Sequence, residues 1–268
     1  MDNASDIRIK ESALVERIKA AGKLAVAFSG GVDSTYLLYK AHEVLGDDAI
    51  AVTVKSQVLT SEDLSLTSYF CEKTGVKQTV ISFDVFSVEE FAANPPDRCY
   101  YCKRKIFESI ANAAEGYVVA DGSNVDDDGD YRPGIRALKE LGIVSPLKEA
   151  GLTKNDIRLL SKEAGILTWD KPSAACLASR FAYGEKITTE GLIRVANAEK
   201  FINDLGFSGI RVRVHGDIAR IEAAPDDIAL LTYERTRKEI SAELKRLGFK
   251  YVTIDIDGYR TGSMNEVL

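Results

Sequence analysis

Histidine, tryptophan and long apolar runs are scarce in this chain of 268 residues, and each shortage narrows the possible chemistry. Its two histidines, His42 and His215, leave thiolates and carboxylates as the main candidate metal ligands, and we expect both imidazoles to be structural or at the surface. No apolar stretch is long enough to span a bilayer, and the polar first ten residues lack the apolar core of a signal peptide. We therefore expect a soluble, cytoplasmic protein with no membrane partner.

Positive charge is also in short supply. The net charge of −6 at pH 7 makes a nucleic-acid partner unexpected, because general nucleic-acid binding usually requires a cationic surface. The four cysteines of a cytoplasmic chain are better interpreted as metal, cluster or catalytic thiols than as disulfides. With 45% hydrophobic residues, the chain can still bury a substantial core in one large or two modest domains.

Short apolar runs alternate with helical patterns through the first 170 residues. Strands are predicted at 24–28, 49–54, 77–81 and 117–120, and helices at 6–21, 35–41, 60–74, 103–114 and 135–141. This alternation predicts an α/β domain over residues 1–170, with a doubly wound parallel sheet covered by helices.

The pattern changes after an aperiodic segment at 167–184. We predict a helix at 190–205, strands at 210–214 and 219–223, one long helix from Pro225 to about 247, and a strand at 251–256. This order predicts a smaller α+β domain over residues 171–268, with a role in substrate binding or oligomerisation.

A glycine loop, Ser29-Gly30-Gly31-Val32-Asp33-Ser34, follows the first predicted strand and opens a helix. Glycines let the backbone approach a ligand closely, and the amides at a helix start, with serine hydroxyls, can donate to phosphate oxygens. A Walker A loop would have lysine in place of Val32, and the dinucleotide-binding pattern GxGxxG is absent. The string instead resembles the PP-loop of ATP pyrophosphatases, which cleave ATP between the α and β phosphates and adenylate a substrate.

Ligands of parallel sheets bind beyond the carboxyl ends of the strands. The glycine loop and the segment at 121–124 both lie there, so we expect them to converge. Asp33 would brace loop amides or meet a cation that bridges to phosphate. Asp126, Asp127 and Asp128 are interpreted as a solvated turn, with magnesium binding as the alternative. The residues expected to bind ATP are Ala27, Ser29, Gly30, Gly31, Asp33, Ser34, Gly122 and Lys103.

Cys99 and Cys102 form a CxxC pair, whose two sulfurs can hold two corners of a metal site or cluster, or act as a redox pair. Cys176 lies among small residues, and Lys171 and Arg180 can lower its pKa; the alternative is simple packing. Three cysteines from separate segments would suit a [4Fe–4S] cluster with one open iron, which can bind and deliver an extra sulfide. Cys71 is assigned to core packing.

Six motifs in order resemble the LarE family of ATP-dependent sulfur transferases, which help to build the nickel-pincer nucleotide of lactate racemase. They are SGGVDS at 29–34, the run from Asn94 to Lys103, Asp121 to Asp127, Lys171 to Arg180, Arg211 to Asp217 and Gly258 to Glu266. The resemblance implies a substrate, pyridinium-3,5-biscarboxylic acid mononucleotide, that is adenylated with Mg²⁺-bound ATP and then converted to thiocarboxylates, with release of pyrophosphate and AMP. It also implies a homo-oligomer, expected to be a hexamer.

The sulfur source divides this family. One branch sacrifices the sulfur of the cysteine that matches Cys176, leaving dehydroalanine. The other branch also has a CxxC pair and binds a [4Fe–4S] cluster that carries sulfide. With Cys99, Cys102 and Cys176 all present, the sequence matches the cluster branch, and sacrifice of Cys176 remains the alternative.

Three arginines are expected to bind the substrate phosphate: Arg180, Arg211 and Arg213. Arg211 and Arg213 alternate along a strand and so share one face, and a subunit interface or a solvated surface is the alternative. Glu222 on the partner strand is a candidate cation ligand, and Glu199 is expected to be an exposed helix residue. Rival functions are a tRNA-thiolating enzyme of the same superfamily, an ammonia-using amide synthetase that would not need Cys176, and a nucleotide-binding scaffold.

Overall fold

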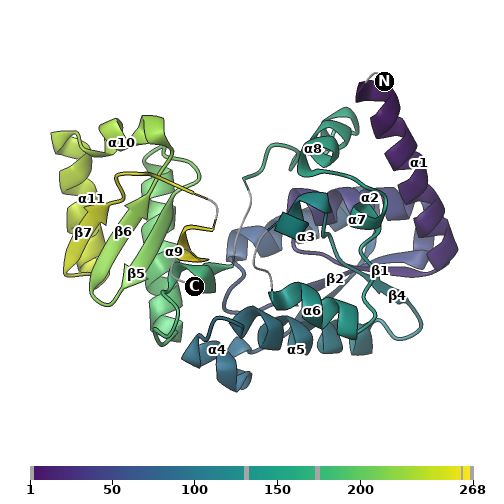
Figure 1. Cartoon of the computed structure of the whole chain (residues 1–268), viewed down its shortest axis with the longest axis horizontal. Coiled ribbons are helices and arrows are strands. Elements are labelled where there is room, and N and C mark those ends of the chain that lie inside the picture. Colours follow the sequence, from purple (N-terminus) through teal and green to yellow (C-terminus); the bar gives the residue numbers. More distant parts are fainter. Residues whose placement is uncertain (1–2, 130–132, 173–175, 261, 266–268) are drawn as a thin grey trace. The chain divides into compact units, whose positions relative to one another are not determined.

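Four short strands form the parallel sheet around which the first part of the chain is built. The computed structural model describes residues 3–129, 133–172, 176–260 and 262–265. The strands are β1 (Leu24–Ala27), β2 (Ala49–Lys55), β3 (Lys77–Ser82) and β4 (Val118–Ala120). Their order is β3-β2-β1-β4 with every pairing parallel, which confirms the predicted α/β sheet (Figure 1).

Helices cover both faces of this sheet. They are α1 (Asn3–Ala21), α2 (Val32–Leu45), α3 (Ser61–Thr74), α5 (Arg98–Ala113), α6 (Pro133–Glu140), α7 (Pro146–Glu149) and α8 (Lys154–Glu163). Successive residues of a strand point to opposite faces, so Leu24 and Val26 pack in the core formed with α1, α2, α7 and α8. Ala25, between them, packs in the second core, formed with α5 and α6 on the other face. Burial on both sides explains why β1, β2 and β4 are apolar runs, whereas the edge strand β3 is largely exposed and of mixed polarity.

The second part of the chain forms a smaller sheet with its own helices. Its elements are α4 (Glu89–Ala93), α9 (Thr189–Asp204), β5 (Arg211–His215), β6 (Ile218–Glu222), α10 (Pro225–Leu231), α11 (Glu234–Arg246) and β7 (Tyr251–Ile254). The order is β5-β6-β7, with β5 and β6 antiparallel and β6 and β7 parallel. Val212, Val214 and Ile221 are buried on one face, and the charged residues between them occupy the other.

Two compact units result. The first unit consists of Met1–Val85 and Cys99–Ala174, and the second of Phe86–Arg98 and Ala175–Leu268. The chain therefore enters the second unit for a short segment, which includes α4, before it returns for α5. The roles predicted for residues 1–170 and 171–268 stay predictions. In the part of the chain that the structure describes, no helix combines the length and apolar character needed to cross a bilayer.

One prediction of secondary structure was wrong, and three of the described helices, α4, α7 and α8, were not predicted. The long helix expected from Pro225 to 247 is two helices, because Tyr233 adopts extended backbone with φ −58° and ψ 141° between α10 and α11. Helix α8 was not predicted, although Thr153 and Asp156 form a capping box in which each side chain accepts a hydrogen bond from the other residue's amide. The remaining predicted strands and helices are present, with ends shifted by a few residues.

Candidate active site

The glycine loop lies between β1 and α2, as predicted. The Phe28 amide donates to the Val52 carbonyl (2.9 Å), so pairing with β2 extends one residue beyond β1 before the chain turns. Gly30 has a φ of +72°, and a Cβ there would lie 3.1 Å from the Thr67 Cγ2 atom of α3. Both the backbone conformation and the space therefore favour glycine.

Inside the loop the two serine hydroxyls interact with each other. Ser29 Oγ lies 3.2 Å from Ser34 Oγ, which also donates to the Gly31 carbonyl (3.2 Å). Gly31 is the N-cap of α2 and has no side chain to occupy the first amides of the helix. Such amides lack intrahelical partners and attract anions, so the start of α2 is suited to phosphate.

The segment after β4 approaches the same loop. A Cβ added at Gly122 would lie 3.0 Å from the Ser34 amide nitrogen, and Asn124 Nδ2 donates to Asp33 Oδ1 (3.4 Å). Asp121 anchors this segment by accepting a hydrogen bond from Ser145 Oγ (2.6 Å). The convergence predicted for the two loops is thus confirmed.

Two lysines that the sequence reasoning did not link to the loop contact it directly. Lys154, the first residue of α8, forms an ion pair with Asp33, and burial raises the pKa of the Asp33 carboxyl even though this ammonium opposes the shift. Lys171 Nζ donates to the Gly30 carbonyl (3.3 Å) and to Asp63 Oδ1 (2.8 Å). Lys171 therefore has partners on the ATP loop and α3, whereas the sequence had suggested a role beside Cys176.

The CxxC pair occupies the first turn of α5. Cys99 is partly buried and Cys102 is buried, and their i, i+3 spacing puts both on the same side of the helix. The stem of Lys103 packs against Gly134 of α6 so closely that a Cβ at Gly134 would lie 2.5 Å from the Lys103 Cδ atom. Contact of Lys103 with ATP stays a prediction.

Cys176 is exposed and precedes a short 3₁₀ turn, Leu177–Arg180, in the second unit. Its carbonyl accepts hydrogen bonds from Ser179 Oγ (2.7 Å) and Arg180 Nη1 (3.4 Å), so the turn is closed on the Cys176 backbone. None of the four cysteines, all of which the structure describes, is disulfide-bonded.

Arg180 is buried and its guanidinium binds Glu199 through two hydrogen bonds, Nε to Oε1 (2.7 Å) and Nη2 to Oε2 (3.1 Å). Glu199 Oε1 also accepts from the Val212 amide (2.9 Å). The expectation that Glu199 is exposed was wrong, because Arg180 neutralises the carboxylate inside the unit. The Arg211 guanidinium lies over the Tyr259 ring, 5.5 Å from its centroid. Its pKa is lowered, mainly by burial and secondly by repulsion from Arg180.

Arg213 and Glu222 form a second buried pair. Glu222 Oε2 accepts from Arg213 Nε (2.9 Å) and Nη2 (2.7 Å), and Glu222 Oε1 accepts from Arg220 Nη2 (3.1 Å) and Ser263 Oγ (2.8 Å). The Glu222 side chain is fully buried, so its charge is compensated by arginines. A role as a cation ligand stays a prediction, and it would require exchange of these partners.

The candidate donors for an iron–sulfur cluster are divided between the units. Cys99 and Cys102 belong to the first and Cys176 to the second. Among the described residues, no group of three or more His, Cys, Asp or Glu side chains is arranged to hold a metal ion. Cysteine thiolates are nevertheless the usual ligands of such clusters, so the residue types fit.

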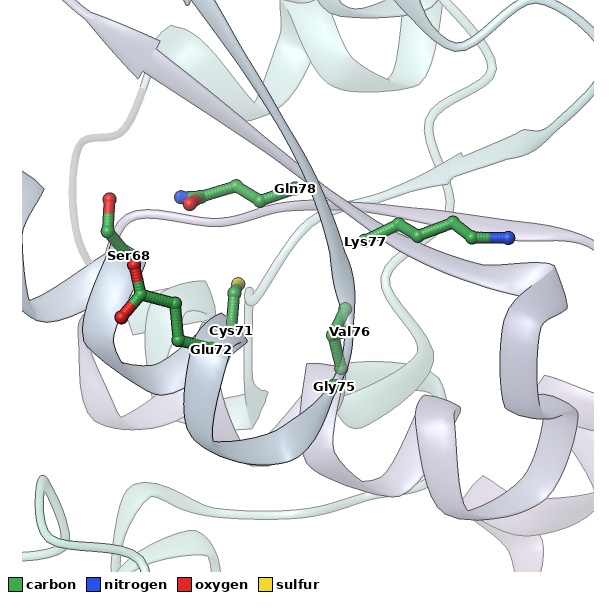
Figure 2. Close-up of a pocket in the computed structure, with 7 residues that line it drawn as sticks. All are labelled: Ser68, Cys71, Glu72, Gly75, Val76, Lys77 and Gln78. Atoms are coloured by element: carbon green, nitrogen blue, oxygen red, sulfur yellow. The ribbon is translucent and has the colours of Figure 1, made fainter.

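Cys71 lies away from these groups, on α3, beside a shallow pocket formed with the start of β3. The lining residues are Ser68, Cys71, Glu72, Gly75, Val76, Lys77 and Gln78. Figure 2 shows Lys77 and Gln78 pointing to opposite sides of the chain, as expected for a strand. Burial raises the pKa of the Cys71 thiol to about 11, which keeps it neutral and confirms its assignment to packing.

Known proteins resemble both the first unit and the whole chain. Residues 11–114 match the family model described as asparagine synthase. The chain is 40% identical over 246 residues to an uncharacterized protein of Synechocystis sp., covering 91% of this chain and 92% of that protein. It is 37% identical over 263 residues to pyridinium-3,5-bisthiocarboxylic acid mononucleotide synthase of Lactiplantibacillus plantarum, covering 97% and 95%. An uncharacterized protein of Methanocaldococcus jannaschii is 32% identical over 258 residues, covering 95% of this chain and 97% of its own length.

Proposed function

The chain belongs to the LarE family of ATP-dependent sulfur transferases, and on that premise we propose that it adenylates the carboxylates of pyridinium-3,5-biscarboxylic acid mononucleotide and converts them to thiocarboxylates. The observation that carries this proposal is an exposed cysteine, Cys176, in a chain whose first unit has an ATP loop. An enzyme that only adenylates would need the loop alone.

In the first half of the reaction, a substrate carboxylate oxygen forms a bond to the α-phosphorus of ATP. The bond from that phosphorus to the bridging oxygen breaks, its electron pair leaves with pyrophosphate, and an acyl-adenylate remains. The carboxylate is already ionised at neutral pH, so no histidine is needed as a base. The α2 amides and the Ser29 and Ser34 hydroxyls orient the phosphates, and Asp33 on the same loop is the carboxylate that fits a Mg²⁺ ion.

In the second half, a sulfur nucleophile attacks the acyl carbon and AMP leaves, giving a thiocarboxylate. Two rounds give the bisthiocarboxylate. Cys176 is in the second unit, where Arg180, Arg211 and Arg213 are the candidate ligands of the substrate phosphate. Arg180 and Arg213 bind carboxylates within this unit, and burial lowers the pKa of the Arg211 guanidinium.

Cys99, Cys102 and Cys176 would hold a [4Fe–4S] cluster, which when bound would supply an open iron able to carry sulfide. The residue before Cys99 is anchored within the second unit. Arg98 is buried and donates from Nη1 to Asn94 Oδ1 (2.6 Å) and to the Ala178 carbonyl (2.9 Å). Both contacts hold the chain in the second unit just before it returns to the first at Cys99. Membership of a hexamer and a cytoplasmic location stay predictions.

The test is a turnover assay on protein purified anaerobically, with iron and sulfide analysis. ATP, Mg²⁺, sulfide and the biscarboxylate nucleotide are supplied, and pyrophosphate, thiocarboxylate product and the mass of the Cys176 peptide are measured. We expect several products per chain with Cys176 intact. One product or fewer per chain, with Cys176 converted to dehydroalanine, would instead establish sacrifice.

Two variants separate the steps. Cys176→Ala is expected to release pyrophosphate but to form no thiocarboxylate, whereas Cys71→Ala, which removes a buried thiol, serves as the matched control and is expected to retain both activities. Thiocarboxylate formation by Cys176→Ala would overturn the proposal. Absence of pyrophosphate release with this nucleotide in the unaltered protein would refute the substrate assignment.

A further inference from the structure

Lys171 is a positioned cation at the edge of the ATP loop. Its backbone is held from both sides, because its amide donates to the Thr168 carbonyl (3.1 Å) and its carbonyl accepts from Arg158 Nη2 (3.0 Å). The side chain is about one-fifth exposed and ends between the Gly30 carbonyl and Asp63. A lysine held this way is aimed at the loop by the fold.

Two lysines near the loop are paired with carboxylates before ATP arrives. Lys154 pairs with Asp33 on one side, and Lys171 pairs with Asp63 on the other. Asp63 is itself held in place, since Thr60 Oγ1 donates to its second oxygen, Oδ2 (2.7 Å). A polyphosphate that enters this loop meets two carboxylates, so its binding is favoured only if the ammonium groups turn toward the phosphates.

We propose that Lys171 binds the β and γ phosphates of ATP, and then pyrophosphate, by leaving Asp63 for the anion. When the bond between the α-phosphorus and the bridging oxygen breaks, negative charge accumulates on the pyrophosphate that leaves. An ammonium group at the loop stabilises that charge without any proton transfer. Lys171 rather than Asp63 is thus the functional member of the pair, and Asp63 competes with the phosphates for it.

This proposal rests on the ATP-splitting half of the proposed function and not on sulfur transfer. It is therefore tested by pyrophosphate binding alone, in the presence of Mg²⁺ and with no substrate nucleotide. Isothermal titration calorimetry is carried out on the full chain, and thermal unfolding of each variant checks that it is folded.

Lys171→Met is expected to weaken pyrophosphate binding about ten- to a hundredfold, which is the usual range for loss of a hydrogen bond between charged groups. Lys171→Arg keeps the charge and is expected to stay within a few-fold of the unaltered protein. Lys162→Met, which removes an exposed lysine of α8, is the matched control and should have no effect.

Asp63→Asn provides the decisive comparison. If Asp63 competes with the anion, this substitution tightens pyrophosphate binding, and the gain disappears when Lys171→Met is added. If Lys171 is only a strut between the loop and α3, Asp63→Asn and Lys171→Met both weaken binding, and the proposal is wrong. An equal gain from Asp63→Asn with and without Lys171 would show simple repulsion and would likewise overturn it. The two proposals can fail separately. If the variants bind pyrophosphate as expected but the turnover assay yields no thiocarboxylate, this inference stands and the sulfur-transfer function is rejected.

Discussion

Glu222 is the residue for which sequence and structure suggest different roles, and the substitution Glu222→Gln separates them. The side chain is fully buried, and both carboxylate oxygens accept hydrogen bonds from arginines. Glutamine has nearly the same shape but no charge, so it leaves the arginines without their counterion. Breaking a buried ion pair from one side costs about 3–5 kcal/mol of stability.

The structure indicates the lower end of that range. Arg220 is partly exposed and keeps Asp255 at 2.9 Å, so it retains a carboxylate partner. Arg213 is only 5% exposed. In the Glu222→Gln variant it still donates a hydrogen bond to the Ser179 carbonyl (3.0 Å), but no carboxylate compensates its charge. The expected loss is therefore about 3 kcal/mol, nearly all of it from Arg213.

The assay is urea-induced unfolding followed by far-ultraviolet circular dichroism, with EDTA present so that no divalent cation contributes. Glu243→Gln, which breaks an exposed pair with Arg246, is the matched control and is expected to leave the unfolding transition unchanged. A loss below about 1 kcal/mol, the scale of an exposed pair, would refute the reasoning. The cation-ligand role would instead be favoured if a divalent cation raises the free energy of unfolding of the unaltered protein and EDTA abolishes that gain.

Three further predictions test the loop, the core and the second unit. Gly122→Ala places a Cβ 3.0 Å from the Ser34 amide nitrogen, and such overpacking costs about 1–3 kcal/mol. ATP binding measured by calorimetry should therefore weaken roughly tenfold. An unchanged dissociation constant would contradict the close approach of the two loops. Because the pKa of the Cys71 thiol is raised from 9.0 to about 11 in the folded protein, the unfolded chain loses this proton at lower pH. The free energy of unfolding, measured with urea, should therefore fall more steeply between pH 9 and pH 11 than in Cys71→Ala. Equal slopes of the free energy against pH in the two proteins would disprove this. Asn94→Ala forces alanine into a φ of 54° and removes the Asn94 acceptor of Arg98, at a cost of about 3 kcal/mol that denaturant unfolding can measure; a loss near zero would exclude the inferred anchoring role.

Local sequence signals were sufficient for most of the first unit. Strands β1, β2 and β4 are buried on both faces, so each is a compact apolar run, and the glycine loop is a contiguous string between two such elements. The break between α10 and α11 could not be predicted in the same way. Residues 232 and 233 are threonine and tyrosine, neither of which is a strong helix breaker, and the helical pattern continues on both sides.

The site was predictable where its residues are neighbours in the sequence and unpredictable where tertiary contacts choose the partners. Lys154 lies 121 positions from Asp33, and Lys171 lies 108 from Asp63, so no local pattern links them. Glu199 looked like an ordinary charged residue of a helix. It is buried because Arg180 and the Val212 amide satisfy its oxygens, and that compensation depends on the packing of α9 against β5.

The path of the chain bears on how the two halves of the reaction depend on the fold. The chain passes from one unit to the other three times, at residues 85–86, 98–99 and 174–175. Cys99 directly follows the second crossing, and Cys176 lies two residues after Ala174 at the third. The two lysines, the glycine loop, Gly122, Cys99 and Cys102 all belong to the first unit, whereas Cys176 belongs to the second. If the proposed function is right, damage confined to the second unit, such as Asn94→Ala, should leave pyrophosphate binding intact while impairing sulfur transfer, because the glycine loop belongs to the first unit and Cys176 to the second.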